Sequence, residues 1–338
     1  MGFWLDFSAL DHYHPRLVWR MMNLSWRRIA LFLLVALTVW GVGLSSASAV
    51  APAQGLPSAY LVFPYINAGG DQETRIELLN LSGDPQLVNC FFVSKNRNLC
   101  NEIGFFVSMT PYQPLSWLAT EGLNDTFSGS AAPPFAGTGE LKCVVVAPRP
   151  EVEFHNTIQG RATAFDTSGA TVSYDAVGFQ RLSDGDYTGV ISLDGVTYAQ
   201  CPDKLHFQVF ADQPNALPPA LSDLILVPCT EDLLLQTPTS TTVQFLATNE
   251  FEQVVSMSIG ITCFDQRHLS DIADALTRST AGTDMLHLFV RGTSVPVIGL
   301  VIDAVPFAGN IGTAGNEPSL QGGRSANVVF PLATDFFP

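Results

Sequence analysis

The feature that most constrains this chain is a long succession of short runs rich in β-branched and aromatic residues, each bounded by Gly, Pro, Asn or Asp. Such runs are typical of β-strands. The sequence therefore predicts an all-β fold. The runs cover 59–66, 74–81, 86–93, 141–148, 157–165, 170–182, 187–193, 196–201, 224–229, 241–248, 256–264, 286–292, 295–305 and 324–332.

Only two stretches have helical character. In 267–279 the residues Leu269, Ile272 and Leu276 share one face, and Asp271 lies early, as the helix dipole favours. A single helical turn is expected over 114–122. We therefore predict one or two short helices within the β-fold.

The spacing of turn signals indicates the architecture. Asp-Gly at 184–185 and at 194–195 marks tight hairpins, so we expect 170–201 to form a meander. Many short strands with frequent turns favour antiparallel β-sandwiches of Ig-like type over parallel α/β sheets. Runs such as 224–229 are apolar on both faces, which suits a packed sandwich.

Five stretches of the first half have a counterpart in the second half, in the same order. They predict an internal duplication, with a first β-sandwich and its added meander at 50–212, a Pro-rich linker at 213–222 and a second β-sandwich at 223–338. The matched pairs are 61–64 with 225–228, 75–81 with 242–248, 87–93 with 260–266, 141–148 with 299–306, and 159–165 with 322–330.

The N-terminal segment has the layout of a secretory signal peptide. Arg27 and Arg28 precede an apolar core at 29–43, and Ala47-Ser48-Ala49 is a small-residue cleavage site. We expect 1–49 to combine a non-native extension with this signal, with initiation at Met21 or Met22. A retained membrane anchor is the alternative, although the core is shorter than the roughly 20 residues of a spanning helix. The expected location is exported, either periplasmic or extracellular on the cell surface.

The chain is acidic. Residues 1–49 hold four of the 16 basic and two of the 31 acidic residues, so 12 and 29 remain and the net charge of the rest is −17. Binding a phosphate backbone or anionic lipid requires clustered Lys and Arg. We therefore expect no nucleic-acid partner, and membrane contact only through an uncleaved signal segment.

An even number of cysteines in an exported chain favours disulfides. We expect Cys90–Cys100 first, because 90–100 reads as a strand and a returning turn. Pairs within each half follow, Cys143–Cys201 and Cys229–Cys263. No C-x-x-C spacing occurs.

Catalytic motifs are missing from 50–338. It has no G-x-S-x-G, no H-E-x-x-H and no Gly-rich phosphate loop. The histidines His155, His206, His268 and His287 are scattered along the sequence. We therefore expect a protein that is not an enzyme and has no cofactor.

Two groups of residues are candidate ligand sites. Asp184, Asp186 and Asp194 would supply oxygens to Ca²⁺, but the lack of a full ligand loop favours their being ordinary hairpin residues. Trp117 with Tyr112 would form a platform that stacks on a sugar ring. A Trp buried at the end of a sandwich core is the favoured alternative for Trp117.

Stretches at 61–65 ("LVFPY"), 90–93 ("CFFV") and 139–144 ("GELKCV") give the chain a resemblance to a group of bacterial exported β-rich proteins. The resemblance covers most of 59–205. It implies export and β-structure, and it implies no activity.

These observations predict an exported, non-enzymatic β-sandwich protein that acts as a surface-structural, adhesive or interaction module with a protein or glycan partner. The alternative is a carbohydrate-binding module, with or without weak glycan-directed hydrolase activity. A third interpretation is partner binding by strand addition at a sheet edge, which a long uncovered edge strand would support.

Overall fold

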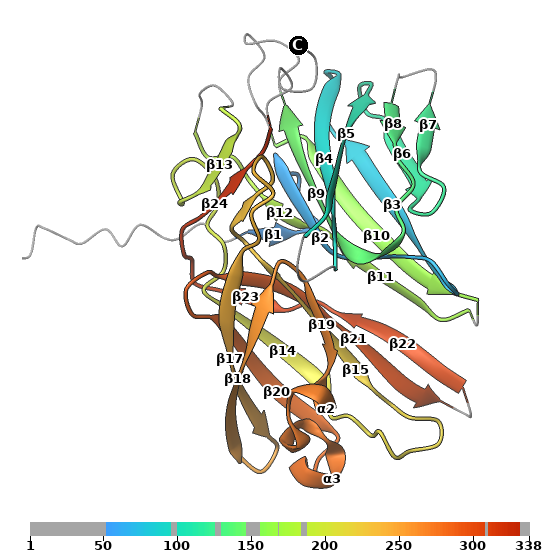
Figure 1. The fold of residues 1–338 in the computed structure, drawn as a ribbon, viewed down its shortest axis with the longest axis vertical. Helices are drawn as coiled ribbons and strands as arrows, with labels where there is room; N and C mark the ends of the chain where they lie inside the picture. The colour runs from blue at the N-terminus through green and yellow to red at the C-terminus, as the bar shows by residue number, and fades with distance from the viewer. Residues whose placement is uncertain are drawn as a thin grey trace, which may run out of the picture. The chain divides into compact units, whose positions relative to one another are not determined.

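The computed structural model describes residues 52–95, 100–125, 130–146, 156–167, 169–183, 188–307 and 310–331 (Figure 1). The expected signal segment lies outside these residues. Residues 49–338 form one compact unit. Its described part is all-β with two short α-helices, which confirms the predicted class.

The first strands of the unit form two antiparallel sheets. β2 and β4 are buried along most of their length, because each lies between two neighbouring strands and carries an apolar run. The six-stranded sheet has the order β1 (Ala53–Gln54), β12 (Val177–Phe179), β2 (Tyr60–Ala68), β9 (Gly137–Val146), β4 (Gln86–Ser94), β5 (Glu102–Met109), and the first four-stranded sheet has the order β11 (Thr171–Asp175), β10 (Ile158–Asp166), β3 (Gln72–Asn80), β6 (Pro114–Leu118). β7 (Leu123–Asp125) pairs with β8 (Ser130–Ala132).

Three further sheets follow. The five-stranded sheet has the order β18 (Val254–Thr262), β17 (Ser240–Asn249), β20 (Met285–Gly292), β14 (Lys204–Phe210), β23 (Ser319–Gln321). The second four-stranded sheet has the order β19 (Asp265–His268), β15 (Ser222–Pro228), β21 (Val297–Phe307), β22 (Asn310–Asn316). The three-stranded sheet joins β13 (Val190–Leu193), β24 (Ala326–Val329) and β16 (Glu231–Asp232), and β16 runs parallel to β24.

The buried side chains form two hydrophobic cores, and β15 contributes to both. Ile225 and Val227 belong to the first core, which is built mainly by the first half of the chain. Leu224 and Leu226 belong to the second core, together with the buried side chains of the five-stranded sheet. Successive side chains of a strand point to opposite faces. The second four-stranded sheet therefore lies between two cores, which explains why its strands are apolar on both faces.

Contacts between neighbouring sheets run in a closed sequence. β2 contacts β10, β11 contacts β22, and β21 contacts β14. Phe330, which directly follows β24, packs edge-on against Tyr60 and Phe91 of the six-stranded sheet. The backbone of Arg324 forms an isolated β-bridge with that of Cys201, just before β14. The five larger sheets thus form a β-propeller-like ring, and the prediction of two tandem Ig-like sandwiches is wrong. The buried sheet between two cores cannot serve as the outer layer of a separate sandwich.

Strand pairing crosses the domain boundary that the sequence suggested. β14 lies before residue 212 and pairs with β20. The expected linker 213–222 connects β14 to β15 as a loop closed by a bridge between Gln213 and Ala220. The expected meander over 170–201 does not form, because β11 pairs with β10, β12 with β2, and β13 with β24.

The matched stretches of the two halves share part of their pairing. β2 pairs with β9 in the first half, and the matching β15 pairs with β21 in the second. β4 also pairs with β9, whereas the matching stretch 260–266 is divided between β18, which pairs with β17, and β19, which pairs with β15. The internal duplication stays a prediction.

The expected helix over 267–279 is broken into three short turns. These are α2 (Leu269–Ile272), a 3-10 turn η1 (Asp274–Leu276) and α3 (Arg278–Ala281), separated by extended backbone at Ala273 and Thr277. Leu269 and Leu276 are fully buried. The expected turn over 114–122 is strand β6, because residues 114–118 pair with β3.

The six cysteines form three disulfides, and the predicted pairing is wrong. The bonds join Cys90–Cys143, Cys100–Cys263 and Cys201–Cys229. Cys90 lies directly opposite Cys143 on paired strands, whereas β5 places Phe105 opposite Cys90. The last two bonds connect the two halves of the chain.

Among the described residues, no helix is long and apolar enough to cross a membrane.

Candidate functional site

The two aromatic candidates lie in different environments. Trp117 is 4% exposed and packs edge-on against Phe105 within the first core. Tyr112 is 68% exposed, in the turn before β6. Since the indole ring is enclosed, Tyr112 alone presents an aromatic face to solvent at this position.

Of the three aspartates proposed for calcium, only Asp194 lies in the described part of the chain. Its Oδ1 accepts the backbone N–H groups of Val196 and Thr197 at 2.8 and 2.6 Å. These hydrogen bonds outweigh burial and lower the pKa of Asp194. Within the described ranges, no three His, Cys, Asp or Glu side chains gather as a metal site.

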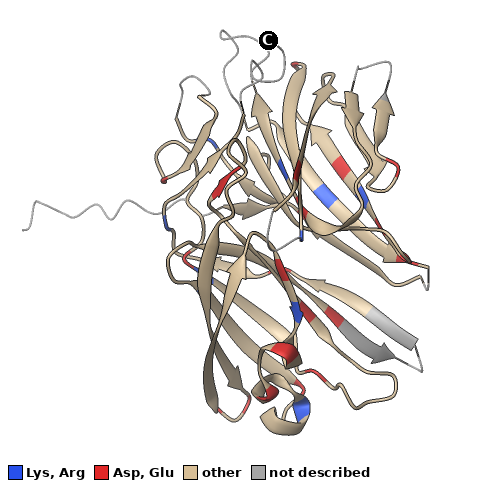
Figure 2. Cartoon of the chain, in the orientation of Figure 1, with Lys and Arg blue, Asp and Glu red and all other residues tan. Residues whose placement is uncertain are grey.

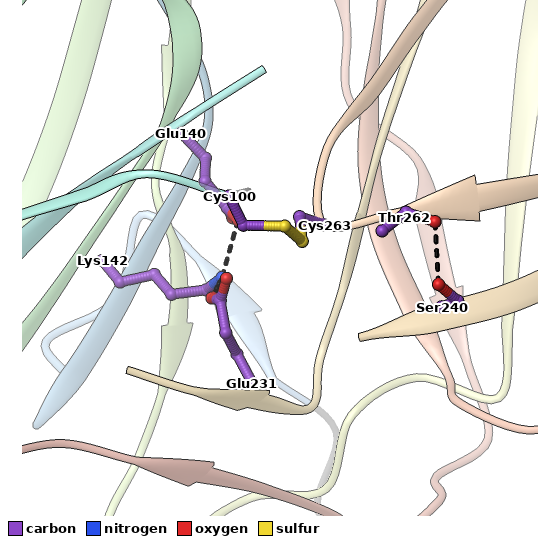
Figure 3. The surroundings of a disulfide bond; sticks show 7 residues. All are labelled: Cys100, Glu140, Lys142, Glu231, Ser240, Thr262 and Cys263. Atoms are coloured by element: carbon purple, nitrogen blue, oxygen red, sulfur yellow. Dashed lines mark hydrogen bonds and ion pairs between the residues drawn. A yellow bond between two sulfur atoms is a disulfide. The ribbon is translucent and has the colours of Figure 1, made fainter. Parts of the chain in front are cut away.

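A buried charged cluster lies beside the Cys100–Cys263 disulfide (Figure 3). Lys142 and Glu140 come from β9, and Glu231 comes from β16. The Nζ of Lys142 lies 2.7 Å from Oε1 of Glu140 and also binds Oε2 of Glu231. The three side chains are at most 4% exposed. This ion pair connects the six-stranded sheet with the three-stranded sheet.

Burial sets the protonation of this cluster. It raises the pKa of Glu140 to about 8, against the attraction of Lys142. Burial also raises the pKa of Glu102, at the start of β5, to about 8, and the charge of Glu231 adds to the effect. For Lys142, burial lowers the pKa, but the two glutamates outweigh it and the net pKa is raised. One oxygen on each of the three glutamates has no hydrogen-bond partner among the described residues.

We expect a pH dependence of stability from Glu102. A carboxyl whose pKa is higher in the folded state binds a proton on folding between its unfolded pKa of 4.5 and its folded pKa of about 8. Its contribution is therefore complete below pH 4.5 and is lost as the pH rises to 8. Urea unfolding at a series of pH values should show a shallower decline in Glu102→Gln than in the wild type. Parallel curves for the two proteins would contradict this assignment.

β18 is an edge strand with unusual properties. It pairs with β17 on one side, and within the described part of the chain no strand pairs with its other side. Its nine residues, "VVSMSIGIT", include no charged residue and no proline. Figure 2 shows both strands of this hairpin in tan, with acidic residues at the turn that joins them. Most of its side chains are exposed or half-buried.

The hydrogen-bond pattern defines which backbone groups of β18 point away from the sheet. Asn249 donates to the carbonyl of Gln253 at one end of the hairpin, and Cys263 donates to Thr239 at the other. Both hydrogen bonds join odd-numbered residues. Along an antiparallel ladder, the backbone N–H and C=O groups of successive residues point to opposite sides of the strand. The even-numbered residues 254, 256, 258, 260 and 262 therefore point outward. Consistently, the carbonyl of Gly260 accepts a hydrogen bond from Arg267 instead of from β17.

Other edges of the described sheets are protected in ways that β18 is not. Natural proteins protect edges with charges, proline, short length or a covering segment. β5 carries Glu102, β6 begins with Pro114, and β1, β13, β16 and β23 have four residues or fewer. β22 lies against β11. β18 therefore combines length, neutrality and exposed backbone groups.

The C-terminal end of β18 is fixed in place. Cys263 directly follows the strand and is bonded to Cys100 (Figure 3). Ser240 and Thr262 join the two hairpin strands at this end through their hydroxyl groups, 2.8 Å apart. The disulfide therefore anchors the hairpin whose outer edge is open.

A second candidate is a groove of about 630 Å³ over the first four-stranded sheet. Its polar residues include Glu77, Ser116, Arg161 and Asp175, which lie side by side on four neighbouring strands. The Nε of Arg161 lies 3.1 Å from Oδ1 of Asp175. Charged and polar side chains in this row suit a polar ligand.

Sequence reasoning missed these features for different reasons. The sequence predicted a strand over 256–264, close to β18, but its edge position depends on pairing. Lys142 and Glu231 are 89 residues apart, and neither stands in a motif.

Comparisons with protein-family models, curated proteins and solved structures found no match.

Proposed function

We propose that this chain is an exported, non-enzymatic interaction protein that binds an extended segment of another protein by strand addition along β18. The single observation that carries the proposal is the nine-residue neutral edge with outward backbone groups. An added strand would pair with these groups, and main-chain hydrogen bonds would supply affinity.

Export is supported by two independent features. One is the signal-peptide layout of 27–49, and the other is the three disulfides, which persist in oxidising compartments. The periplasm and the cell surface both meet this condition.

Charge defines the chemistry of the partner. Glu250 and Glu252 lie at one end of β18, and the chain is acidic overall. At the other end, Asp265 is buried and paired with Arg267. A second copy of this chain would bring the same net negative charge, which opposes self-association. The partner segment is therefore expected to be neutral in its centre, to alternate apolar residues, and to carry Lys or Arg at the end beside Glu250 and Glu252.

Ser258→Pro tests this function. Proline removes the outward N–H of residue 258 and leaves the bonds between β18 and β17 intact, as proline on an edge strand does. Peptides selected from a display library on the wild type should bind at least tenfold more weakly to Ser258→Pro, and equally well to Ser258→Ala.

The matched structural control is Met257→Pro, which removes an inward N–H and should lower the melting temperature. Equal peptide binding by wild type and Ser258→Pro would contradict strand addition at β18. A dimer of the wild type that Ser258→Pro abolishes would contradict the proposed partner, because the segment added to β18 would then come from a second copy of this chain.

The groove over the first four-stranded sheet favours a second candidate function, carbohydrate binding. Arg161 is 57% exposed and, beside Glu77 and Asp175, would form hydrogen bonds with sugar hydroxyls. A glycan array should then show binding that Arg161→Ala abolishes and Ser258→Pro preserves. An array without any signal would remove this candidate.

A further inference from the structure

Two histidines that are far apart in the sequence meet on the solvent face of the five-stranded sheet. His206 lies on β14 and His287 lies on the neighbouring β20, 81 residues later. Register places Phe289 opposite His206 and Gln208 opposite His287, so the two histidines are diagonal neighbours on one face. Nε2 of His206 is 3.3 Å from Nδ1 of His287.

This separation suits two ligands of one metal ion. In a tetrahedral site with metal–nitrogen bonds of roughly 2.0–2.1 Å, two imidazole nitrogens lie about 3.3–3.4 Å apart. The two rings are inclined by only 21°, with their centres 5.5 Å apart. Rotation of both rings about their Cβ–Cγ bonds would direct the two lone pairs at a common ion.

The surroundings hold one ring in place. His206 stacks on Phe289 with ring centres 4.4 Å apart and planes 10° apart.

A hollow of about 480 Å³ beside His206 leaves room for water. Water can occupy the coordination positions of zinc that protein ligands leave open.

We propose that His206 and His287 form a binding site for a late first-row divalent transition ion, such as Cu²⁺ or Zn²⁺. This site is separate from the edge of β18 and independent of the function proposed for it. Nitrogen ligands give Cu²⁺ the higher affinity of the two ions, and they give no site to Ca²⁺ or Mg²⁺.

The test is a calorimetric titration of the full chain with Zn²⁺ and then Cu²⁺, with Mg²⁺ as the negative control. The double variant His206→Ala/His287→Ala should bind one ion fewer than the wild type, and each single variant should bind that ion at least tenfold more weakly. His268→Ala, on another sheet, should bind as the wild type does. His12 and His14 are present in all the variants and cancel in the comparison.

A second measurement reads the site itself. In NMR spectra, the imidazole signals of His206 and His287 should shift or broaden with Zn²⁺, while those of His268 stay unchanged. Equal ion stoichiometry in the wild type and the double variant would overturn the proposal. Unchanged imidazole signals of the pair would also overturn it, since the two rings would then only share a hydrogen bond.

Discussion

Replacing Lys142 with methionine should lower the free energy of unfolding by about 3–5 kcal/mol, the usual cost of removing one partner from a buried ion pair. The ammonium group contacts both Glu140 and Glu231, and all three side chains are enclosed. Without it, two buried carboxyls lose their counter-charge. Urea unfolding of the oxidised protein measures the loss.

The loss should depend on pH. At pH 5 the carboxyls can take up protons and become neutral, so the variant should be less destabilised than at pH 8. Lys204→Met is the matched control, because Lys204 is exposed and the change should be within about 0.5 kcal/mol.

Neutralising all three positions together, as Lys142→Met with Glu140→Gln and Glu231→Gln, should recover part of the lost stability. A loss below about 1 kcal/mol in Lys142→Met would show that the cluster is not the stabilising connection between sheets described above.

Removing the Cys100–Cys263 disulfide should have an effect of similar size. It closes a sequence separation of 163 residues, for which the chain-entropy model gives about 5 kcal/mol. The same model gives about 3.6 kcal/mol for Cys201–Cys229, which closes 28 residues. We expect the alanine double variant of the first pair to be the less stable of the two by about 1–2 kcal/mol.

The position of this disulfide adds a local effect. Cys100 and Cys263 both have positive φ angles, 43° and 55°, in the left-handed region that residues other than glycine rarely adopt. Without the bond, the end of the β17–β18 hairpin should relax. Amide exchange at Ile261, whose N–H points to β17, and at Phe264 should then rise more than at the middle of β17. Equal stability of the two double variants, with no faster exchange at this end, would contradict the anchoring role.

Local pattern was sufficient to locate most strands. The runs at 86–93, 241–248 and 286–292 became β4, β17 and β20 with ends shifted by at most two residues. Alternation or a continuous apolar run depends on the residues of the strand itself, so both can be read directly from the sequence.

Local pattern failed where distant parts of the chain decide the conformation. The run at 267–279 has helical periodicity, yet Asp212, from another part of the chain, accepts the N–H of Ser270, and Arg278 donates its N–H to the carbonyl of Asp212. These contacts favour two separate short helices, α2 and α3, over one continuous helix across 267–279. In the same way, Cys90 bonds to Cys143 because β4 pairs with β9, and no spacing of cysteines encodes that pairing.

The candidate site shows the same division. The sequence identified 256–264 as a strand and strand addition as one possible mode of binding. It could not show that this strand lies at the end of a sheet, because the neighbours of β17 come from residues 285–292 on one side and 254–262 on the other. The meeting of His206 with His287 likewise depends on the pairing of β14 with β20.

The most direct test of strand addition is amide hydrogen exchange of β18, residue by residue, with and without a peptide selected on the wild-type protein. We predict that the amides of Val254, Ser256 and Ser258 exchange quickly in the free protein and become protected when the peptide binds. Met257 should be protected in both states, since its N–H points to β17. Peptide binding that leaves the exchange of Ser256 and Ser258 unchanged would contradict strand addition at this edge.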